Sequence, residues 1–219
     1  MADVILIGGH GKVALLAAPL LVEAGHTVTS VIRNPDHVDE VRATGAEPLV
    51  LDVEQADEAA LAAQFAGKDA VVWSAGAGGG DPERTTAVDR DAAIRSMDAA
   101  RTAGVSRYVM VSYLGASLDH GVPEDDDFHA YAQAKAEADA HLRGSGLDWT
   151  ILGPGALTLD EPSGRIAADP SPEQAKASSH TSRGNVARTI VAALASRGSV
   201  GRQVEYVDGD RPIEDVFGI

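Results

Sequence analysis

A serine, a tyrosine and a lysine are the residues of this sequence whose types and spacing first indicate catalysis. Tyr131 and Lys135 lie four residues apart, so both project from one face of a predicted helix. Tyrosine is a poor base at neutral pH because its pKa is about 10, and an ammonium group one turn away favours the phenolate and lowers that pKa. The pair could exchange a proton with a substrate oxygen, which Ser112 would hydrogen-bond from the end of a predicted strand. An exposed helix pair with no catalytic role is the alternative.

A glycine-rich turn near the N-terminus indicates where a cofactor would bind. The apolar residues 4–7 lead into Gly8-Gly9-His10-Gly11-Lys12-Val13, and an apolar helical pattern follows. Gly8 and Gly11 let the backbone approach a ligand closely, and the free N–H groups at the start of the helix suit an anion such as a pyrophosphate. The spacing, Gly-x-x-Gly-x-x-Ala, differs from the commonest dinucleotide fingerprint, so a turn that binds nothing is the alternative. The His10 side chain either contacts phosphate or faces solvent.

The residue after the second predicted strand bears on which dinucleotide would bind. Sites for NAD usually place an acidic residue here to bind the ribose hydroxyls, whereas an arginine suits the 2′-phosphate of NADP. This position is Arg33, so the sequence favours NADP. Asp36 close by keeps NAD as an alternative, and Arg33 could also be a solvated surface residue.

Two further strand ends would complete the cofactor site. Asp52, followed by Val53, could bond the amino group of an adenine or serve only as a turn residue. Ser74-Ala75-Gly76 would let the backbone pass beneath the ribose groups, or form a plain glycine-rich turn. The expected reaction is hydride transfer to or from a nicotinamide, with the proton handled by Tyr131.

The elements that position these residues alternate between strands and helices. Apolar runs predict strands at residues 4–7, 27–32, 48–51, 70–74, 108–112, 148–152 and 203–207, and helical patterns lie at 12–24, 34–43, 57–65, 85–103, 130–143, 185–195 and 212–217. Buried strands separated by helices predict an α/β fold, a doubly wound parallel sheet in a single domain of residues 1–219. Long loops after strand ends are where such sheets place ligands, so residues 153–182 and 208–219 are expected on the substrate side.

The charge and composition of the chain limit its partners. Lys and Arg number 18 against 33 Asp and Glu, which gives a formal net charge of −15 and disfavours nucleic acid and anionic membranes as partners. The absence of cysteine, of a signal-like N-terminus and of a membrane-length apolar run makes the cytoplasm the expected compartment, with a monomer or homodimer expected there. No metal is expected, because His120 and His129 flank the acidic residues 124–127 with a spacing that matches no ligand motif.

Seven short runs, spread over nearly the whole chain, resemble one family. They are Gly8-Gly-His-Gly11-Lys-Val-Ala14, Val88-Asp89-Arg-Asp-Ala-Ala-Ile94, Tyr131-Ala-Gln-Ala-Lys135-Ala-Glu-Ala-Asp139, Ser145-Gly-Leu-Asp-Trp149-Thr150-Ile151, Pro154-Gly155-Ala-Leu157-Thr158, Ser182-Arg183-Gly-Asn185-Val186-Ala187 and Pro212-Ile213. The sequence resembles the atypical short-chain dehydrogenase/reductases, in the NAD(P)H-binding, NmrA-like branch that is also named NAD-dependent epimerase/dehydratase. The runs around Trp149 and Pro154 are the most specific.

The resemblance implies a Rossmann fold with a small C-terminal substrate region, and NADP as the cofactor, with Pro154 beside it and Lys135 holding the ribose. It also implies a supporting catalytic role for Asp89, because this branch often has an aspartate where better-known relatives have a catalytic asparagine. From the sequence alone, Asp89 would be a surface charge on a helix. The family tends to have an arginine where this chain has Gly153, so that contact to the substrate side or the C-terminal loop is missing here.

These residues together predict an NADP-dependent oxidoreductase that acts on a small carbonyl, alcohol or quinone-type substrate. One alternative is a non-catalytic NADP-sensing regulatory protein, as NmrA-like relatives suggest. Another is a nucleotide-sugar epimerase or dehydratase, although the region beyond residues 148–152 is short for a substrate that usually needs a larger lobe. The substrate would be set by loops 113–128 and 153–182, which carry no recognisable motif.

Overall fold

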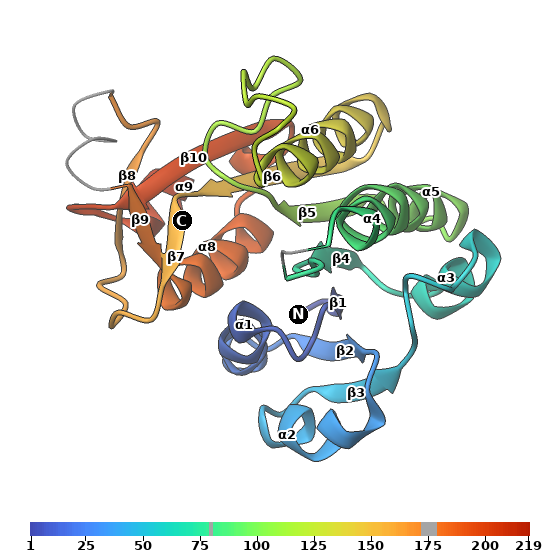
Figure 1. Ribbon diagram of the computed structural model, residues 1–219. Helices are drawn as coiled ribbons and strands as arrows, with labels where there is room; N and C mark the ends of the chain where they lie inside the picture. The colour runs from blue at the N-terminus through green and yellow to red at the C-terminus, as the bar shows by residue number, and fades with distance from the viewer. Residues whose placement is uncertain (79–80, 172–178) are drawn as a thin grey trace.

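A mostly parallel sheet forms the centre of the computed structural model, which describes residues 1–78, 81–171 and 179–219 (Figure 1). Its strand order is β11-β8-β10-β6-β5-β4-β1-β2-β3. Within the described chain, β8 pairs antiparallel with β10 and β11, and the other pairs of this sheet are parallel. The strands are β1 (Asp3–Ile7), β2 (Thr27–Ile32), β3 (Glu47–Val50), β4 (Ala70–Trp73), β5 (Arg107–Val111), β6 (Asp148–Pro154), β8 (Arg165–Ala168), β10 (Arg202–Asp208) and β11 (Arg211–Pro212).

Strand β1 shows why this chain forms a sheet that is buried on both faces. Its side chains alternate, so that Val4 and Leu6 join the core on one face while Ile5 and Ile7 join the core on the other. All four are fully buried. An uninterrupted apolar run is therefore the expected sequence of such a strand, and the predicted doubly wound, Rossmann-like α/β fold is confirmed.

Helices cover each face of the sheet (Figure 1). One face carries α1 (Lys12–Glu23), α2 (Val38–Ala43), α8 (Arg183–Ala195) and α9 (Ile213–Phe217), and the other carries α3 (Glu58–Phe65), α5 (Ala93–Thr102) and α6 (His129–Gly144). Short 3₁₀ turns lie at η1 (Pro35–His37) and η3 (Arg197–Ser199). Among the described helices, none is long and apolar enough to cross a membrane.

The helix predicted at residues 85–103 is not one regular helix. It consists of α4 (Pro82–Thr85), a π-helical stretch η2 (Thr86–Ala92) and α5. Turns of π-helix are rare and are found frequently at functional sites. Asp89 lies in this stretch, and its side chain is buried rather than on the surface as the sequence indicated.

The stretch predicted as irregular between residues 153 and 182 contains strands. β7 (Ala156–Thr158) and β9 (His180–Ser182) pair in parallel as a separate small sheet, and β8 enters the main sheet beside β10. The described sheet is thus parallel as predicted except at this edge, where β8 runs antiparallel to β10 and β11. Residues 172–178 of this stretch, and residues 79 and 80, lie outside the described residues.

Candidate functional site

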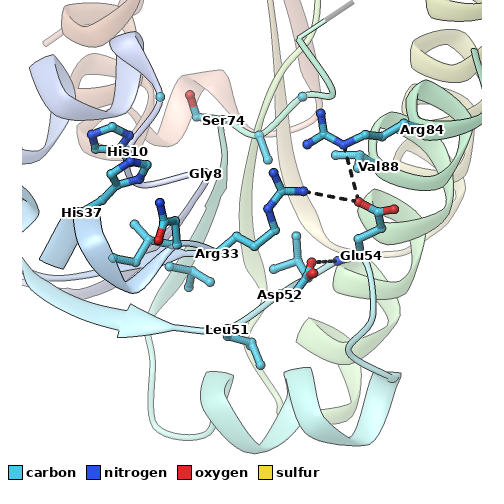
Figure 2. A pocket seen from close by; sticks show the side chains of 17 residues that line it. Gly8, His10, Arg33, His37, Leu51, Asp52, Glu54, Ser74, Arg84 and Val88 are labelled. Atoms are coloured by element: carbon cyan, nitrogen blue, oxygen red, sulfur yellow. Dashed lines mark hydrogen bonds and ion pairs between the residues drawn. The ribbon is translucent and has the colours of Figure 1, made fainter. Parts of the chain in front are cut away.

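A cleft of about 380 Å³ lies at the carboxyl ends of β1, β2, β3 and β4 (Figure 2). In open parallel sheets this is the edge at which ligands bind. The cleft gathers side chains and backbone from five separate segments of the sequence. Nine of the predicted cofactor residues line it, namely Gly8, His10, Gly11, Arg33, Asp52, Val53, Ser74, Ala75 and Gly76.

The glycine turn brings β1 and β4 into close approach at the floor of the cleft. Gly8 has a φ of +83°, and a Cβ built on it would lie 2.7 Å from the Cα of Ala75. The Gly11 N–H donates to the Gly8 carbonyl at 2.8 Å, and α1 begins at Lys12 with no side chain capping its first turn. Backbone N–H groups at this helix start are thus available to an anion. The pyrophosphate of a dinucleotide fits this glycine turn, whose close approach to β4 a larger residue at position 8 would prevent.

Two of the predicted turn residues lie elsewhere. Gly9 packs against β2, where its N–H donates to the Val31 carbonyl at 2.8 Å, and the Lys12 side chain is exposed. Neither lines a described cavity. Gly9 therefore serves the close packing of the turn on the sheet.

Arg33 reaches into the cleft from the end of β2. Its Nη1 lies 3.8 Å from Glu54 Oε2, and Arg84 Nε lies 3.7 Å from the same oxygen (Figure 2). The Arg33 side chain is 57% exposed, so a ligand could still reach it. Two guanidinium groups from different elements thus converge on one carboxylate oxygen inside a cleft.

The loop after β3 is fixed by hydrogen bonds that the sequence did not indicate. The Asp52 carboxylate accepts the Glu54 N–H at 3.0 Å, which matches the turn role that was the alternative for this residue. Arg95, from α5, donates to the carbonyls of Val53, Glu54 and Ala56 at 2.9–3.2 Å. This arginine holds the wall of the cleft in place without lining the cleft itself.

His10 is engaged by its neighbours rather than facing solvent alone. Its ring stacks on that of His37, with centroids 3.5 Å apart (Figure 2). Its Nε2 lies 2.7 Å from Glu40 Oε2. Both histidines line the cleft. The pair forms one wall of the cleft beside the glycine turn.

A second cavity, of about 440 Å³, joins the first at Ser74, Ala75 and Gly76. It brings together the four predicted catalytic residues, because Asp89, Ser112, Tyr131 and Lys135 all line it. They come from η2, the end of β5 and α6. Val13, the remaining turn residue, lines this cavity as well.

The lysine in this cavity does not act on Tyr131 as the spacing predicted. Lys135 is buried, and its Nζ donates to the Val111 carbonyl at 2.8 Å. Burial raises the pKa of the Tyr131 hydroxyl, and the Asp89 and Asp139 carboxylates raise it further. The expected lowering of the Tyr131 pKa is therefore not found, because burial and the two carboxylates together raise it, while the Lys135 ammonium is directed to the Val111 carbonyl.

Ser112 also has a different partner from the one expected. Its hydroxyl donates to Asp139 Oδ2 at 2.5 Å, and both residues are buried. Burial raises the pKa of the Asp139 carboxyl, while Lys135 and the Ser112 hydrogen bond oppose that rise. The Ser112 proton is therefore directed to Asp139 and not to the cavity, so in this arrangement Ser112 can accept a hydrogen bond from a substrate hydroxyl but cannot donate one to a carbonyl oxygen.

Asp89 holds the backbone that the two cavities share. Its Oδ2 accepts the Ala77 N–H at 2.9 Å, and a Cβ on Gly76 would lie 3.1 Å from its Oδ1. Burial raises the pKa of Asp89, against the lowering effect of Lys135 and Arg84. Arg84 also donates to the Ala77 carbonyl at 2.8 Å, so the N–H and the carbonyl of Ala77 are both held by side chains.

A third cavity, of about 400 Å³, continues beyond Tyr131 and Ser112. Pro154, predicted beside the cofactor, lines this cavity and neither of the other two.

The two histidines that flank the acidic residues 124–127 make contacts within the protein. His120 contacts Gln133 and His129 contacts the Val122 carbonyl, so these histidines tie loop 113–128 to α6. Across the described residues, no group of three or more His, Asp or Glu could hold a metal ion.

Comparison with known proteins identifies the family. A family model described as NAD(P)H-binding matches residues 8–197. This chain belongs to that family. It is 32% identical to a Bacillus subtilis protein named as an uncharacterized sugar epimerase, YhfK, over 98% of each chain. A solved structure from Bacillus halodurans, named for the NAD-dependent epimerase/dehydratase class, has a TM-score of 0.89 at 31% identity and covers 100% of this chain and 99% of its own.

A second structure extends the same comparison to oxidoreductases. The oxidoreductase ylbE of Lactococcus lactis has a TM-score of 0.86 at 26% identity, covering 99% of this chain and 95% of that chain. The recognised family and the expectation of a nicotinamide dinucleotide are thus confirmed together. The cleft fits such a group, since it offers the Gly8 cradle, an uncapped helix start and two arginines.

Sequence reasoning missed several residues that shape these cavities, and five of them make the polar or ring contacts described above. Glu54, Arg84 and His37 line the first cleft, while Arg95 and Asp139 act behind the walls. Asp139 belongs to the family-like run that begins at Tyr131, so its position in that run could have marked it as a candidate site residue. The other four carry no local pattern, because their partners lie in distant parts of the chain.

Proposed function

We propose that this protein is an oxidoreductase that transfers a hydride between NADP(H) and a small substrate with a carbonyl or quinone-type group. One observation carries the proposal: the cavity lined by Asp89, Ser112, Tyr131 and Lys135 shares residues 74–76 with the dinucleotide cleft. A nicotinamide lying past Gly76 would face Tyr131. The family-level finding, that relatives are named as oxidoreductase and epimerase, agrees with this class of chemistry.

The roles of the side chains follow from their contacts. When bound, NADPH supplies the hydride, and the Tyr131 hydroxyl supplies the proton, so a carbonyl becomes an alcohol. Lys135 uses one N–H for the Val111 carbonyl and has further N–H groups for a ribose hydroxyl. Asp89 fixes the Ala77 backbone beneath the nicotinamide side. A raised pKa keeps Tyr131 protonated but makes it a weaker acid, so its proton would move to the strongly basic alkoxide that develops as the hydride arrives.

The preference for NADP over NAD is part of the proposal. Arg33 and Arg84 both point at Glu54 within the cleft, and a 2′-phosphate would give these guanidinium groups a stronger anionic partner. Glu54 is the competing feature, because a carboxylate in this place could accept the 2′-hydroxyl of NAD.

The test mixes purified protein with NADPH and a panel of aldehydes, ketones and quinones. Turnover is measured as the loss of NADPH absorbance. Turnover should fall by about a hundredfold or more in Tyr131→Phe, since general acid catalysis contributes that much. Tyr113→Phe removes the hydroxyl of the neighbouring ring, 5.5 Å away between centroids, and should cost far less. Equal turnover in Tyr131→Phe and wild type would remove Tyr131 from the mechanism.

Cofactor titrations separate the remaining alternatives. NADP(H) and NAD(H) are titrated against wild type and Arg33→Ala, and a large loss of affinity for NADP(H) alone would support the proposed preference. Tight NADP(H) binding with no turnover across the panel would favour a sensing protein. Interconversion of a nucleotide sugar without net NADP reduction would favour the epimerase alternative. Absence of binding to either dinucleotide would contradict the whole proposal.

A further inference from the structure

The third cavity lies where a substrate of the proposed reaction would extend. It shares Ser112, Phe128, Tyr131 and Leu157 with the cavity that holds Lys135. A carbonyl placed at the Tyr131 hydroxyl would therefore carry the rest of its molecule into this space of about 400 Å³. The walls of this cavity determine which molecules can follow the carbonyl.

Three aromatic rings form one wall. Tyr113 and Phe128 meet edge to face with centroids 5.3 Å apart, and Tyr131 lies 5.3 Å from Phe128 and 5.5 Å from Tyr113. They come from the segment after β5 and from the start of α6, which loop 113–128 connects. Rings at these distances and angles offer faces and edges to a further ring, and such contacts add about 0.5–1.5 kcal/mol beyond burial.

Apart from Ser112 and the rings, the lining of this cavity is mostly apolar. It consists of Leu114, Pro154 and Gly155, of Ala156 and Leu157 from β7, and of Ser179 just before β9. The Leu157 and Phe128 side chains are 37% and 43% exposed, so both remain open to a ligand. A flat group would pack against the rings and Leu157, whereas a nucleotide sugar would have only the hydroxyls of two serines and two tyrosines among the lining side chains.

The described residues that line this cavity offer no cation to an anionic substrate. None of them is a lysine, arginine or histidine, and the remaining N–H groups of Lys135 in the adjoining cavity are assigned to the cofactor ribose. Asp127 lines the adjoining cavity, next to Phe128, and the chain carries a net charge of −15. A carboxylate or phosphate would lose its hydration here and meet negative charge.

We infer that this cavity receives an uncharged, planar ring system attached to the reacting carbonyl, so that the substrate is a neutral aryl or quinone-type carbonyl compound. The inference rests on the proposed function for the position of the reacting group. The ring itself is recognised by Tyr113, Phe128 and Tyr131, independently of whether hydride transfer occurs.

A binding experiment tests the ring without requiring turnover. Naphthol, the naphthoate anion and the saturated alcohol decalol are titrated by calorimetry into the full chain, with and without saturating NADP⁺. Naphthol should bind at least about tenfold more tightly than either of the others. The saturated rings of decalol cannot make aromatic contacts, and the carboxylate of naphthoate would lose its hydration without gaining a cation. Equal affinity of all three, or no binding of naphthol, would overturn the inference.

Variants assign the effect to the rings. Phe128→Ala and Tyr113→Leu should each weaken naphthol binding by about threefold to tenfold, in line with one lost ring contact. Tyr113→Phe keeps the ring and should restore the affinity lost in Tyr113→Leu. Leu118→Ala, which removes a 61% exposed side chain from the same loop outside the cavity, should leave binding unchanged. Unchanged affinity in both ring variants would contradict the assignment.

A kinetic comparison separates this inference from the proposed function. Naphthaldehyde and cyclohexanecarbaldehyde are compared under NADPH, and Phe128→Ala should raise KM for the former only. Ring-selective binding without any turnover would reject hydride transfer and keep the ring site. Turnover that is equally efficient with aliphatic or carboxylate-bearing aldehydes would reject the ring site and keep hydride transfer.

Discussion

The Ser112 hydroxyl and the Asp139 carboxylate form a buried hydrogen bond of 2.5 Å beside the cavity that Tyr131 and Lys135 line. The other carboxylate oxygen of Asp139 has no hydrogen-bond partner among the described residues. Asp139 also raises the pKa of Tyr131, after burial and Asp89. One buried acid thus influences two of the residues assigned to the reaction, although it touches no substrate.

Replacing this acid should change how stability depends on pH. Burial raises the folded-state pKa of Asp139 above the value of about 3.9 in an unfolded chain, so its contribution to stability is full below that value and is lost as pH rises through the folded pKa. Asp139→Asn removes this loss. The free energy of unfolding of the variant, minus that of wild type, should therefore increase as pH rises from about 4 towards neutrality.

Urea unfolding at a series of pH values measures that difference. Asp125→Asn, at an exposed position of loop 113–128, is the control and should follow wild type across the series. A difference for Asp139→Asn that stays flat, or that falls with pH, would show that the carboxyl is not destabilised in the folded protein.

The close approach at Gly8 makes a second prediction. Gly8→Ala should destabilise the protein by about 1–3 kcal/mol and abolish dinucleotide binding, because it combines a positive φ with a contact of 2.7 Å to Ala75. Gly104→Ala is matched in backbone conformation, with a φ of +77° and open space around its Cβ. Thermal unfolding and cofactor titration of both variants separate the two effects. Similar losses of affinity in both would mean that general strain, and not the cleft, is responsible.

Arg95 should act on the cofactor at a distance. Arg95→Ala frees the carbonyls of Val53, Glu54 and Ala56, so amide hydrogen exchange over residues 52–56 should speed up and dinucleotide affinity should fall by about threefold to tenfold, in line with hydrogen bonds worth about 1 kcal/mol each. Arg101→Ala, on the same helix with a largely exposed side chain, should change neither. Protection of residues 52–56 that survives in Arg95→Ala would contradict this role.

Glu54 should oppose the binding of NADP. Glu54→Gln removes the carboxylate that Arg33 and Arg84 share, so the dissociation constant for NADP(H) should fall by about twofold to fivefold, as expected for partly exposed ion pairs. The constant for NAD(H) should rise or stay the same. Parallel titrations of both cofactors decide the matter: weaker NAD(H) binding with no gain for NADP(H) would indicate that Glu54 holds the ribose hydroxyls of NAD.

The parts of the fold that follow from local pattern were predictable. Residues 4–7 are apolar without a break because β1 is buried on both faces, and Gly25, Gly45 and Gly104 follow helices with positive φ values, as expected of helix ends. Strand β8 was not predictable in this way. Its sequence, Arg165–Ala168, contains one large apolar residue, Ile166, and so shows no clear strand pattern. The segment is a strand because β10 and β11 pair with it on either side.

Side-chain partners in the site were less predictable than backbone positions. The spacing of Tyr131 and Lys135 correctly places both in one cavity, yet it cannot indicate that Val111 offers the lysine a nearer acceptor. In the same way, Glu54 and Arg84 are thirty residues apart and meet only because the segment after β3 and helix α4, which follows β4, both lie beside the same cleft. Such pairings depend on the whole fold and leave no trace in local sequence.

The π-helical stretch at residues 86–92 means that the length of the chain, and not only its composition, determines which side chain lies under Ala77. One residue more or fewer in an α-helix turns everything beyond it by about 100° around the helix axis. Deleting a single residue there would restore regular winding and rotate the acid out of register with the sheet, while every other residue of the motif stayed in the sequence. A relative can therefore keep the aspartate in an alignment and still lack it at the cavity, so insertions and deletions in this helix should be compared before residue identities are.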